Sequence, residues 1–186
     1  MPKEKKDEHG VVLDYLPRGR MSDSKEEPVA QLLGTEYFSL LEVVLRDDVE
    51  AEPGEEIYIG EGERDKVKYI KRSITVMDLT AAGKDELEDR LDELIEDNEE
   101  RLVDFFNNAG PITPRMHQLE ALPGVGKKHM WEVIDERKVE EFESYDDLKE
   151  RVPLLPDPRK MIKNRIKEEL SGDADYYLFT VPKKND

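Results

Sequence analysis

Short apolar stretches bounded by turn residues fill the first 80 residues of the chain. The stretches are rich in Val, Leu, Ile and aromatic side chains and cover residues 11–16, 28–33, 37–45, 56–59 and 67–76. Gly34 and the pair Pro53 and Gly54 lie between some of them as turn signals. Several short strands at this spacing predict a small β-barrel or sandwich over residues 10–80. The polar residues 1–9 before it are expected to form a flexible tail.

The pattern changes to a helical period after about residue 84. Apolar residues recur at the intervals of one helix face at Leu87, Leu91, Leu94, Ile95, Leu102, Phe105 and Phe106. This stripe predicts an acidic linker helix within residues 81–110 that ends near Gly110 and Pro111. Thr113 and Pro114 then resemble the N-cap and first-turn proline of a following helix.

The last third of the chain predicts three more helices and one strand. Met130, Val133 and Ile134 continue a short helix, Ser144 can cap another, and residues 159–170 form the last. The segment 173–186 is expected to hold a strand over residues 176–181, paired with an edge of the N-terminal sheet, and then a tail. The predicted fold class is therefore α+β.

Composition narrows the class of protein. Hydrophobic residues make up 37% of the 186 residues and charged residues 40%, which predicts a modest core and a densely ionic surface. The chain has no cysteine, which excludes disulfides and thiolate metal sites. No apolar run approaches the roughly 18 residues of a membrane span, so we expect a cytoplasmic protein with no membrane contact. His9, His117 and His129 lack paired-ligand spacing, and we expect no metal or other cofactor.

Charge is distributed unevenly along the chain. The net charge is −17, which argues against a polyanionic partner. Residues 83–104 hold eleven acids and three bases, whereas residues 64–72 hold five bases and one acid. A local basic patch can bind a polyanion on an acidic protein, because the Debye length is only about 8 Å at physiological salt. The net charge alone therefore does not exclude nucleic-acid binding.

The most distinctive motif is the sequence Leu-Pro-Gly-Val-Gly-Lys-Lys at residues 122–128, between two helical patterns. Its glycines allow positive φ and close approach of the backbone. The amides that follow belong to the first turn of a helix, where they lack intrahelical partners and carry partial positive charge. Such a helix start can hold a phosphate oxygen, assisted here by two lysines. The alternative is a glycine-bent connection that binds nothing.

This arrangement resembles the helix-hairpin-helix motif, a family that binds DNA or RNA backbone phosphates without reading bases. The resemblance implies that the binding residues are Pro123, Gly124, Val125, Gly126, Lys127 and Lys128. It also implies a tandem domain over residues 111–172, with a second hairpin at residues 153–158. The second hairpin has no glycine, and Asp157 stands where an N-cap belongs, so its carboxylate would occupy the phosphate position. We therefore expect only the first hairpin to contact phosphate.

A second candidate surface lies on the predicted barrel. Barrels of the oligonucleotide/oligosaccharide-binding (OB) type combine a basic groove with aromatic platforms. The candidate residues for an OB-like barrel are Arg18, Arg20, Tyr58, Arg64, Lys66, Lys68 and Arg72. The alternative is that the lysines only block edge-to-edge pairing of strands.

Residues 10–182 as a whole resemble an archaeal family of unknown function described as predicted nucleic-acid or RNA binders. The resemblance rests on Tyr58-Ile59-Gly60, on Asp78-Leu79-Thr80 and on the hairpin. It implies a non-enzymatic protein that contacts RNA or DNA backbones without sequence specificity, with RNA favoured. The alternative is an adaptor whose acidic helix binds a basic protein. A nucleic-acid-processing enzyme comes third, since the sequence contains no nucleophile elbow and no phosphate-binding loop ending in Lys-Ser/Thr.

Overall fold

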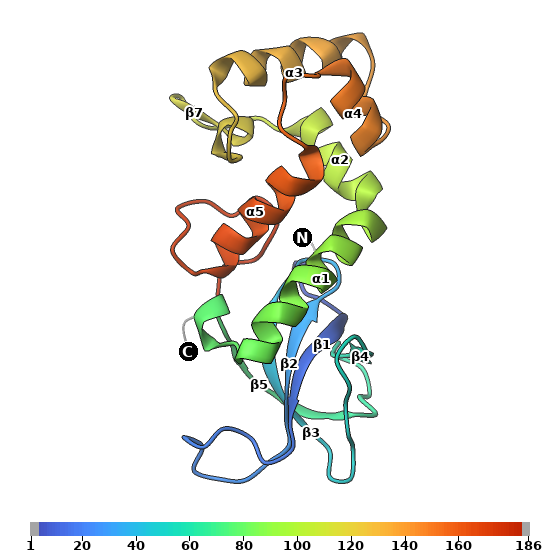
Figure 1. Cartoon of the computed structure of the whole chain (residues 1–186), viewed down its shortest axis with the longest axis vertical. Coiled ribbons are helices and arrows are strands. Elements are labelled where there is room, and N and C mark those ends of the chain that lie inside the picture. The colour runs from blue at the N-terminus through green and yellow to red at the C-terminus, as the bar shows by residue number, and fades with distance from the viewer. Residues whose placement is uncertain (1–3, 184–186) are drawn as a thin grey trace. The chain divides into compact units, whose positions relative to one another are not determined.

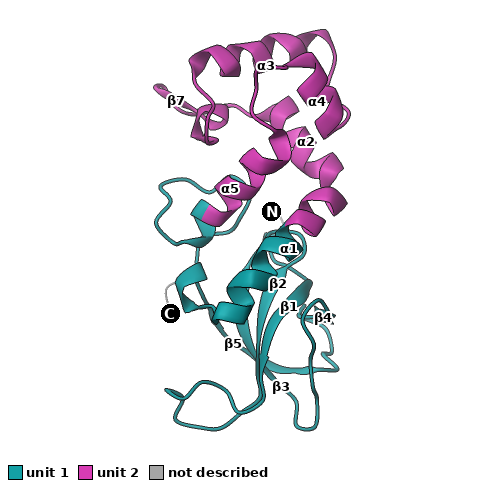
Figure 2. Cartoon of the chain, viewed as in Figure 1, with its two compact units in different colours: residues 1–91, 168–186 teal, residues 92–167 magenta. Residues whose placement is uncertain are grey.

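The computed structural model describes residues 4–183, which divide into two compact units (Figure 2). Among the described residues, unit 1 comprises residues 4–91 and 168–183, and unit 2 comprises residues 92–167. The division falls inside the helices α1 (Ala81–Asp97) and α5 (Pro158–Leu170). No separate linker helix spans residues 81–110 in the described chain, because α1 ends at Asp97 and contributes residues to both units.

Unit 1 is built on a curled antiparallel sheet of five strands (Figure 1). The strands are β1 (His9–Leu16), β2 (Val29–Gly34), β3 (Leu40–Leu45), β4 (Glu56–Tyr58) and β5 (Val67–Ser73), in the order β4-β1-β2-β3-β5. All five strands lie where the apolar stretches predicted them. The sheet is a half-barrel and not a closed barrel, because the edge strands β4 and β5 do not pair within residues 4–183.

The inner face of the curled sheet carries an apolar core. Its buried members are Val12, Ala30, Leu32, Val43, Leu45, Ala51, Ile57, Ile59 and Val67. The central strand β2 is buried along its whole length, so its two faces are both covered. On the outer face, the start of α1 approaches so closely that a Cβ on Gly83 would lie 2.8 Å from Gln31 Oε1. Glycine at this position therefore permits the contact between helix and sheet.

The segments next to both termini are held by buried carboxylates. Asp7 is 7% exposed and accepts hydrogen bonds from the backbone amides of Glu36, Tyr37 and Ser39. Residues 4–8 are thus anchored, which corrects the expectation of a flexible tail; residues 1–3 lie outside the described residues. Glu169 likewise accepts the amides of residues 178–180. The segment 176–181 forms no strand, because these amides bond to a side chain in place of a sheet edge.

Unit 2 contains the end of α1, α2 (Glu99–Asn108), α3 (Lys127–Val139), α4 (Tyr145–Arg151) and most of α5. A two-stranded hairpin, β6 (Pro111–Thr113) with β7 (Met116–His117), and a 3₁₀ turn, η2 (Gln118–Ala121), precede α3. The predicted helix start at Thr113 and Pro114 is therefore wrong. Proline disfavours helical backbone in the residue before it, and here that residue ends a strand. The single stripe over residues 87–106 is also divided, since α1 and α2 meet at Asn98.

The core of unit 2 includes Tyr145, which is fully buried at the start of α4. Ser144 caps this helix as predicted, with its Oγ accepting the amide of Asp147 at 2.9 Å. The Tyr145 hydroxyl donates to the carbonyl of Ile95 at 2.6 Å, and the Arg159 guanidinium lies 4.8 Å from the ring centre. Burial raises the pKa of the Tyr145 phenol, so it remains a hydrogen-bond donor.

Candidate functional site

The turn between η2 and α3, residues 122–126, is named the first hairpin. Leu122 and Val125 are buried, and the Val125 amide donates to the Leu122 carbonyl at 3.2 Å. Gly124 lies exposed between them with φ of 80°, a conformation that a side chain strongly disfavours. Two apolar anchors thus fix the turn, while its glycines reach the surface.

Gly126 is the N-cap residue of α3 and leaves the helix start uncovered. Its φ is −96°, so the second glycine is not needed for a left-handed conformation. A Cβ built on Gly126 would meet no atom within 4 Å, and no side chain caps this helix. The first helical bond runs from the Met130 amide to the Gly126 carbonyl at 3.0 Å. Within residues 4–183, the amides of residues 127–129 have no hydrogen-bond partner.

Two free lysines stand at this helix start. Lys127 and Lys128 are exposed, and neither forms an ion pair with any residue between 4 and 183. The first turn of α3 contains no acidic residue, so nothing in it offsets the positive end of the helix dipole. Of the six residues predicted to bind phosphate, Val125 is buried, Pro123 is half-buried, and Gly124, Gly126, Lys127 and Lys128 are exposed.

The turn between α4 and α5, residues 153–157, is named the second hairpin. It repeats the backbone bond of the first hairpin, since the Leu155 amide donates to the Val152 carbonyl at 3.1 Å. Here Asp157 Oδ1 accepts the amide of Arg159 at 2.9 Å. This helix start is therefore occupied by its own carboxylate, in agreement with the contrast expected between the two hairpins.

The helix α5 carries four bases that are not buried, Arg159, Lys160, Lys163 and Lys167, and of these Arg159 and Lys163 form ion pairs inside unit 2. Arg159 forms ion pairs with Glu96 and Asp146, and Lys163 lies 2.9 Å from Asp92. The sequence shows the basic residues of α5, but it does not show that their acidic partners on α1 and α4 lie close to them in the folded chain.

The two hairpins touch at Gly124. A Cβ on Gly124 would lie 3.1 Å from Pro156 Cγ, and its φ is positive. Gly124→Ala is therefore expected to destabilise the protein by about 1–2 kcal/mol, from backbone strain and crowding together. Gly126→Ala, at the open and unstrained neighbour, is the matched control and should cost less than about 1 kcal/mol. Equal losses in urea unfolding would contradict this account of the turn.

The predicted barrel residues do not form a free basic face. Glu42 is fully buried on β3. Its carboxylate accepts hydrogen bonds from Arg20 Nε at 2.7 Å and from Arg72 Nε at 2.8 Å. Gln31 donates to the same carboxylate at 3.0 Å. Burial would raise the pKa of Glu42, but these three donors outweigh it and hold the pKa below its usual range. Arg20 and Arg72 are thus committed to an internal network.

The other predicted barrel residues are divided between internal contacts and solvent. Lys66 pairs with Glu55, and Arg64 Nε donates to the Gly60 carbonyl at 2.7 Å. The Tyr58 hydroxyl accepts the Gly62 amide at 2.9 Å, so its ring lies over that turn. Arg18 and Lys68 are exposed and have no hydrogen bond or ion pair within the described chain. The pairing of β3 with β5 also contains two register shifts, so the side chains of β5 do not follow a regular alternation against β3.

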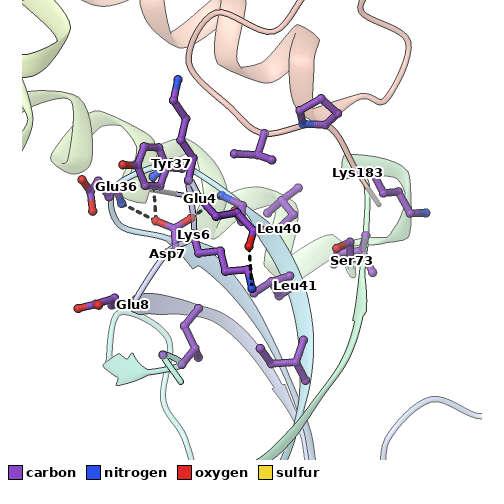
Figure 3. A pocket seen from close by; sticks show the side chains of 18 of the residues that line it. Glu4, Lys6, Asp7, Glu8, Glu36, Tyr37, Leu40, Leu41, Ser73 and Lys183 are labelled. Atoms are coloured by element: carbon purple, nitrogen blue, oxygen red, sulfur yellow. Dashed lines mark hydrogen bonds and ion pairs between the residues drawn. The ribbon is translucent and has the colours of Figure 1, made fainter. Parts of the chain in front are cut away.

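Unit 1 also contains a pocket of about 840 Å³ (Figure 3). Both edges of the open sheet contribute to it, through residues 58–64 and 70–75, together with residues 4–8, 36–41 and the segment 169–183. Asp7, Glu36 and Tyr37 lie close together on one side, where the Asp7 carboxylate bonds to the backbone. The lining mixes acids and bases, and Lys6 is already paired with Glu4 and Glu61. Of the predicted barrel residues, it contains Tyr58 and Arg64.

Among residues 4–183, no three His, Asp or Glu side chains are grouped so that they could hold a metal ion. No helix in the same range is both long and apolar enough to cross a membrane.

Comparison with known proteins places the chain in a family. Residues 6–181 match the family described as protein of unknown function, DUF655. The uncharacterized protein MJ0038 of Methanocaldococcus jannaschii is 43% identical over 183 residues, covering 97% of this chain and 83% of that protein. The crystal structure of Af1531 from Archaeoglobus fulgidus, which carries the same family designation, is 44% identical with a TM-score of 0.81. That match covers 94% of this chain and 100% of the other. Both relatives are archaeal, and the chain belongs to the DUF655 family.

Proposed function

We propose that this protein is a non-enzymatic nucleic-acid-binding protein that holds a backbone phosphate at the first hairpin. The observation that carries the proposal is the uncovered start of α3, with free amides at residues 127–129 and two unpaired lysines. Unpartnered amides, a positive dipole end and ammonium groups together favour a phosphate oxygen. In this proposal, the 3₁₀ turn η2, the first hairpin and α3 act as a helix-hairpin-helix with a short first helix, and the second hairpin serves packing.

RNA is favoured over DNA as the target. A single hairpin contacts few phosphates. Most basic side chains predicted to bind on unit 1 are already engaged in internal contacts, so they offer little further attraction for a long duplex. Unpaired segments of RNA present phosphates together with accessible bases, so they can be bound through a small surface. From the predicted set, the half-barrel contributes at most Arg18 and Lys68 as exposed cations without a hydrogen bond or ion pair in the described chain.

The adaptor alternative receives less support from the contacts. Asp92, Glu96 and Glu99 of the acidic stretch lie within ion-pair distance of Lys163 or Arg159 in the same unit. These acids are partly neutralised by the protein itself and offer less charge to a basic partner.

The proposal is tested by affinity as a function of salt. Binding to tRNA, single-stranded RNA and duplex DNA should fall with a slope of about −1 to −2 in log affinity against log salt, as expected for one or two phosphates. Fluorescence anisotropy of labelled nucleic acids measures this slope. Absence of binding to all three at low salt would refute the proposal.

A further inference from the structure

The only tryptophan of the chain, Trp131, lies on the surface of α3. It is 55% exposed, and neither a ring stack nor a cation–π contact joins it to any of residues 4–183. Large aromatic side chains are usually buried, since their burial stabilises the fold strongly. Much of the Trp131 ring therefore remains exposed to solvent in folded unit 2.

Trp131 shares a helix face with the two free lysines. It follows Lys127 by four residues and Lys128 by three, the spacings that bring side chains onto one face. The buried residues of α3 are Met130, Val133 and Ile134, whereas Lys127, Lys128 and Trp131 are all exposed. With a rise of 1.5 Å per residue, the backbone of Trp131 lies about 3–6 Å along the helix axis from the free amides of residues 127–129.

This face combines the two features that bind single strands. The lysines and amides attract phosphate, and an exposed aromatic ring lets a base stack on it whatever its identity. One turn further on, the same exposed face carries Asp135, which repels phosphates. The continuous attractive surface before Asp135 therefore covers about one turn of helix, a size suited to one or two nucleotides, and the exposed Lys138 lies beyond it.

We propose that Trp131 stacks on an unpaired base of the strand whose phosphate binds at the first hairpin. This inference rests on the proposed function and adds to it a target class, which is single-stranded nucleic acid. In a duplex the bases are stacked on one another, and their faces are not free for the ring. The protein should therefore prefer single strands to duplexes of the same length.

Because the chain has one tryptophan, its fluorescence reports on this site directly. Titration with single-stranded oligonucleotides of about 12 nucleotides, within the usual site size for such proteins, should quench the emission. A duplex of equal length should bind more weakly and quench less. Trp131→Ala should weaken single-strand binding at least about tenfold, whereas Trp131→Phe should retain most of it. Val139→Ala, at an 82% exposed position at the far end of α3, is the control and should change nothing.

The outcomes separate this inference from the proposed function. Binding by the wild-type protein without quenching, and with unchanged affinity for Trp131→Ala, would overturn the stacking role and leave phosphate binding intact. Equal weakening of single-strand and duplex binding by Trp131→Ala would also overturn it. Failure of the wild-type protein to bind any nucleic acid would overturn both.

Discussion

The double substitution Lys127→Glu with Lys128→Glu is expected to reduce nucleic-acid affinity about 100-fold or more. Each substitution replaces an attraction to phosphate with a repulsion, at an exposed helix start where no ion pair with residues 4–183 is lost. A change of about 1.4 kcal/mol for each lysine corresponds to tenfold in affinity. Both glutamates lie in the first turn of α3, where negative charge is compatible with the helix dipole, so stability should be preserved. Anisotropy titrations at one fixed salt concentration measure the effect.

The matched control is Lys84→Glu with Lys138→Glu. These lysines are exposed and unpaired within the described residues, and the substitution changes the net charge by the same amount. Its effect on affinity should stay within about threefold, because neither lysine belongs to the first turn of α3, where the phosphate is held. Equal losses for the two double variants would mean that binding follows net charge and not the first hairpin.

Glu42→Ala is expected to give the largest loss of stability, about 3 kcal/mol. The substitution leaves the Arg20 and Arg72 guanidinium groups and the Gln31 amide without their shared acceptor. Breaking a buried pair typically costs about 3–5 kcal/mol, and the lower end applies because both arginines are partly exposed and can rehydrate. Glu55→Gln, at a more exposed pair with Lys66, should cost less than about 1 kcal/mol. Urea unfolding compares the two, and similar losses would contradict the role given to Glu42.

The pH dependence of stability should also change in Glu42→Ala. Because the folded-state pKa of Glu42 is lowered, its contribution is complete above the ordinary glutamate pKa of about 4.3. That contribution is lost as the pH falls through the lower folded-state pKa. The melting temperature of the wild-type protein should therefore fall more steeply below about pH 4 than that of Glu42→Ala. Part of the slope should remain, since the pKa of Asp78 is lowered by hydrogen bonds from Thr75. Parallel curves would contradict the assignment.

The sequence predicted features that depend on neighbouring residues. The strands of unit 1, the cap at Ser144 and the contrast between the two hairpins each follow from residues within a few positions of one another. The break at Asn98 and the β6–β7 hairpin were missed because both interrupt patterns that are locally compatible with helix.

Features that depend on distant residues could not be predicted. Arg20 and Arg72 have the residue types of a basic surface, but their acceptor Glu42 lies 22 and 30 residues away. Asp7 resembled part of a solvated tail because its amide donors are about 30 residues away. Trp131 is different, because its spacing from Lys127 and Lys128 was present in the sequence. Only its exposure in the structure distinguished it from a core residue.

The central claim is that the free amides at the start of α3 hold a backbone phosphate. Backbone amide chemical shifts, followed by NMR while single-stranded RNA is added, test it most directly. The account predicts that the largest shifts occur at Lys127, Lys128 and His129, and that added salt reverses them. Shifts confined to other parts of the chain, with these three amides unchanged at saturation, would contradict it.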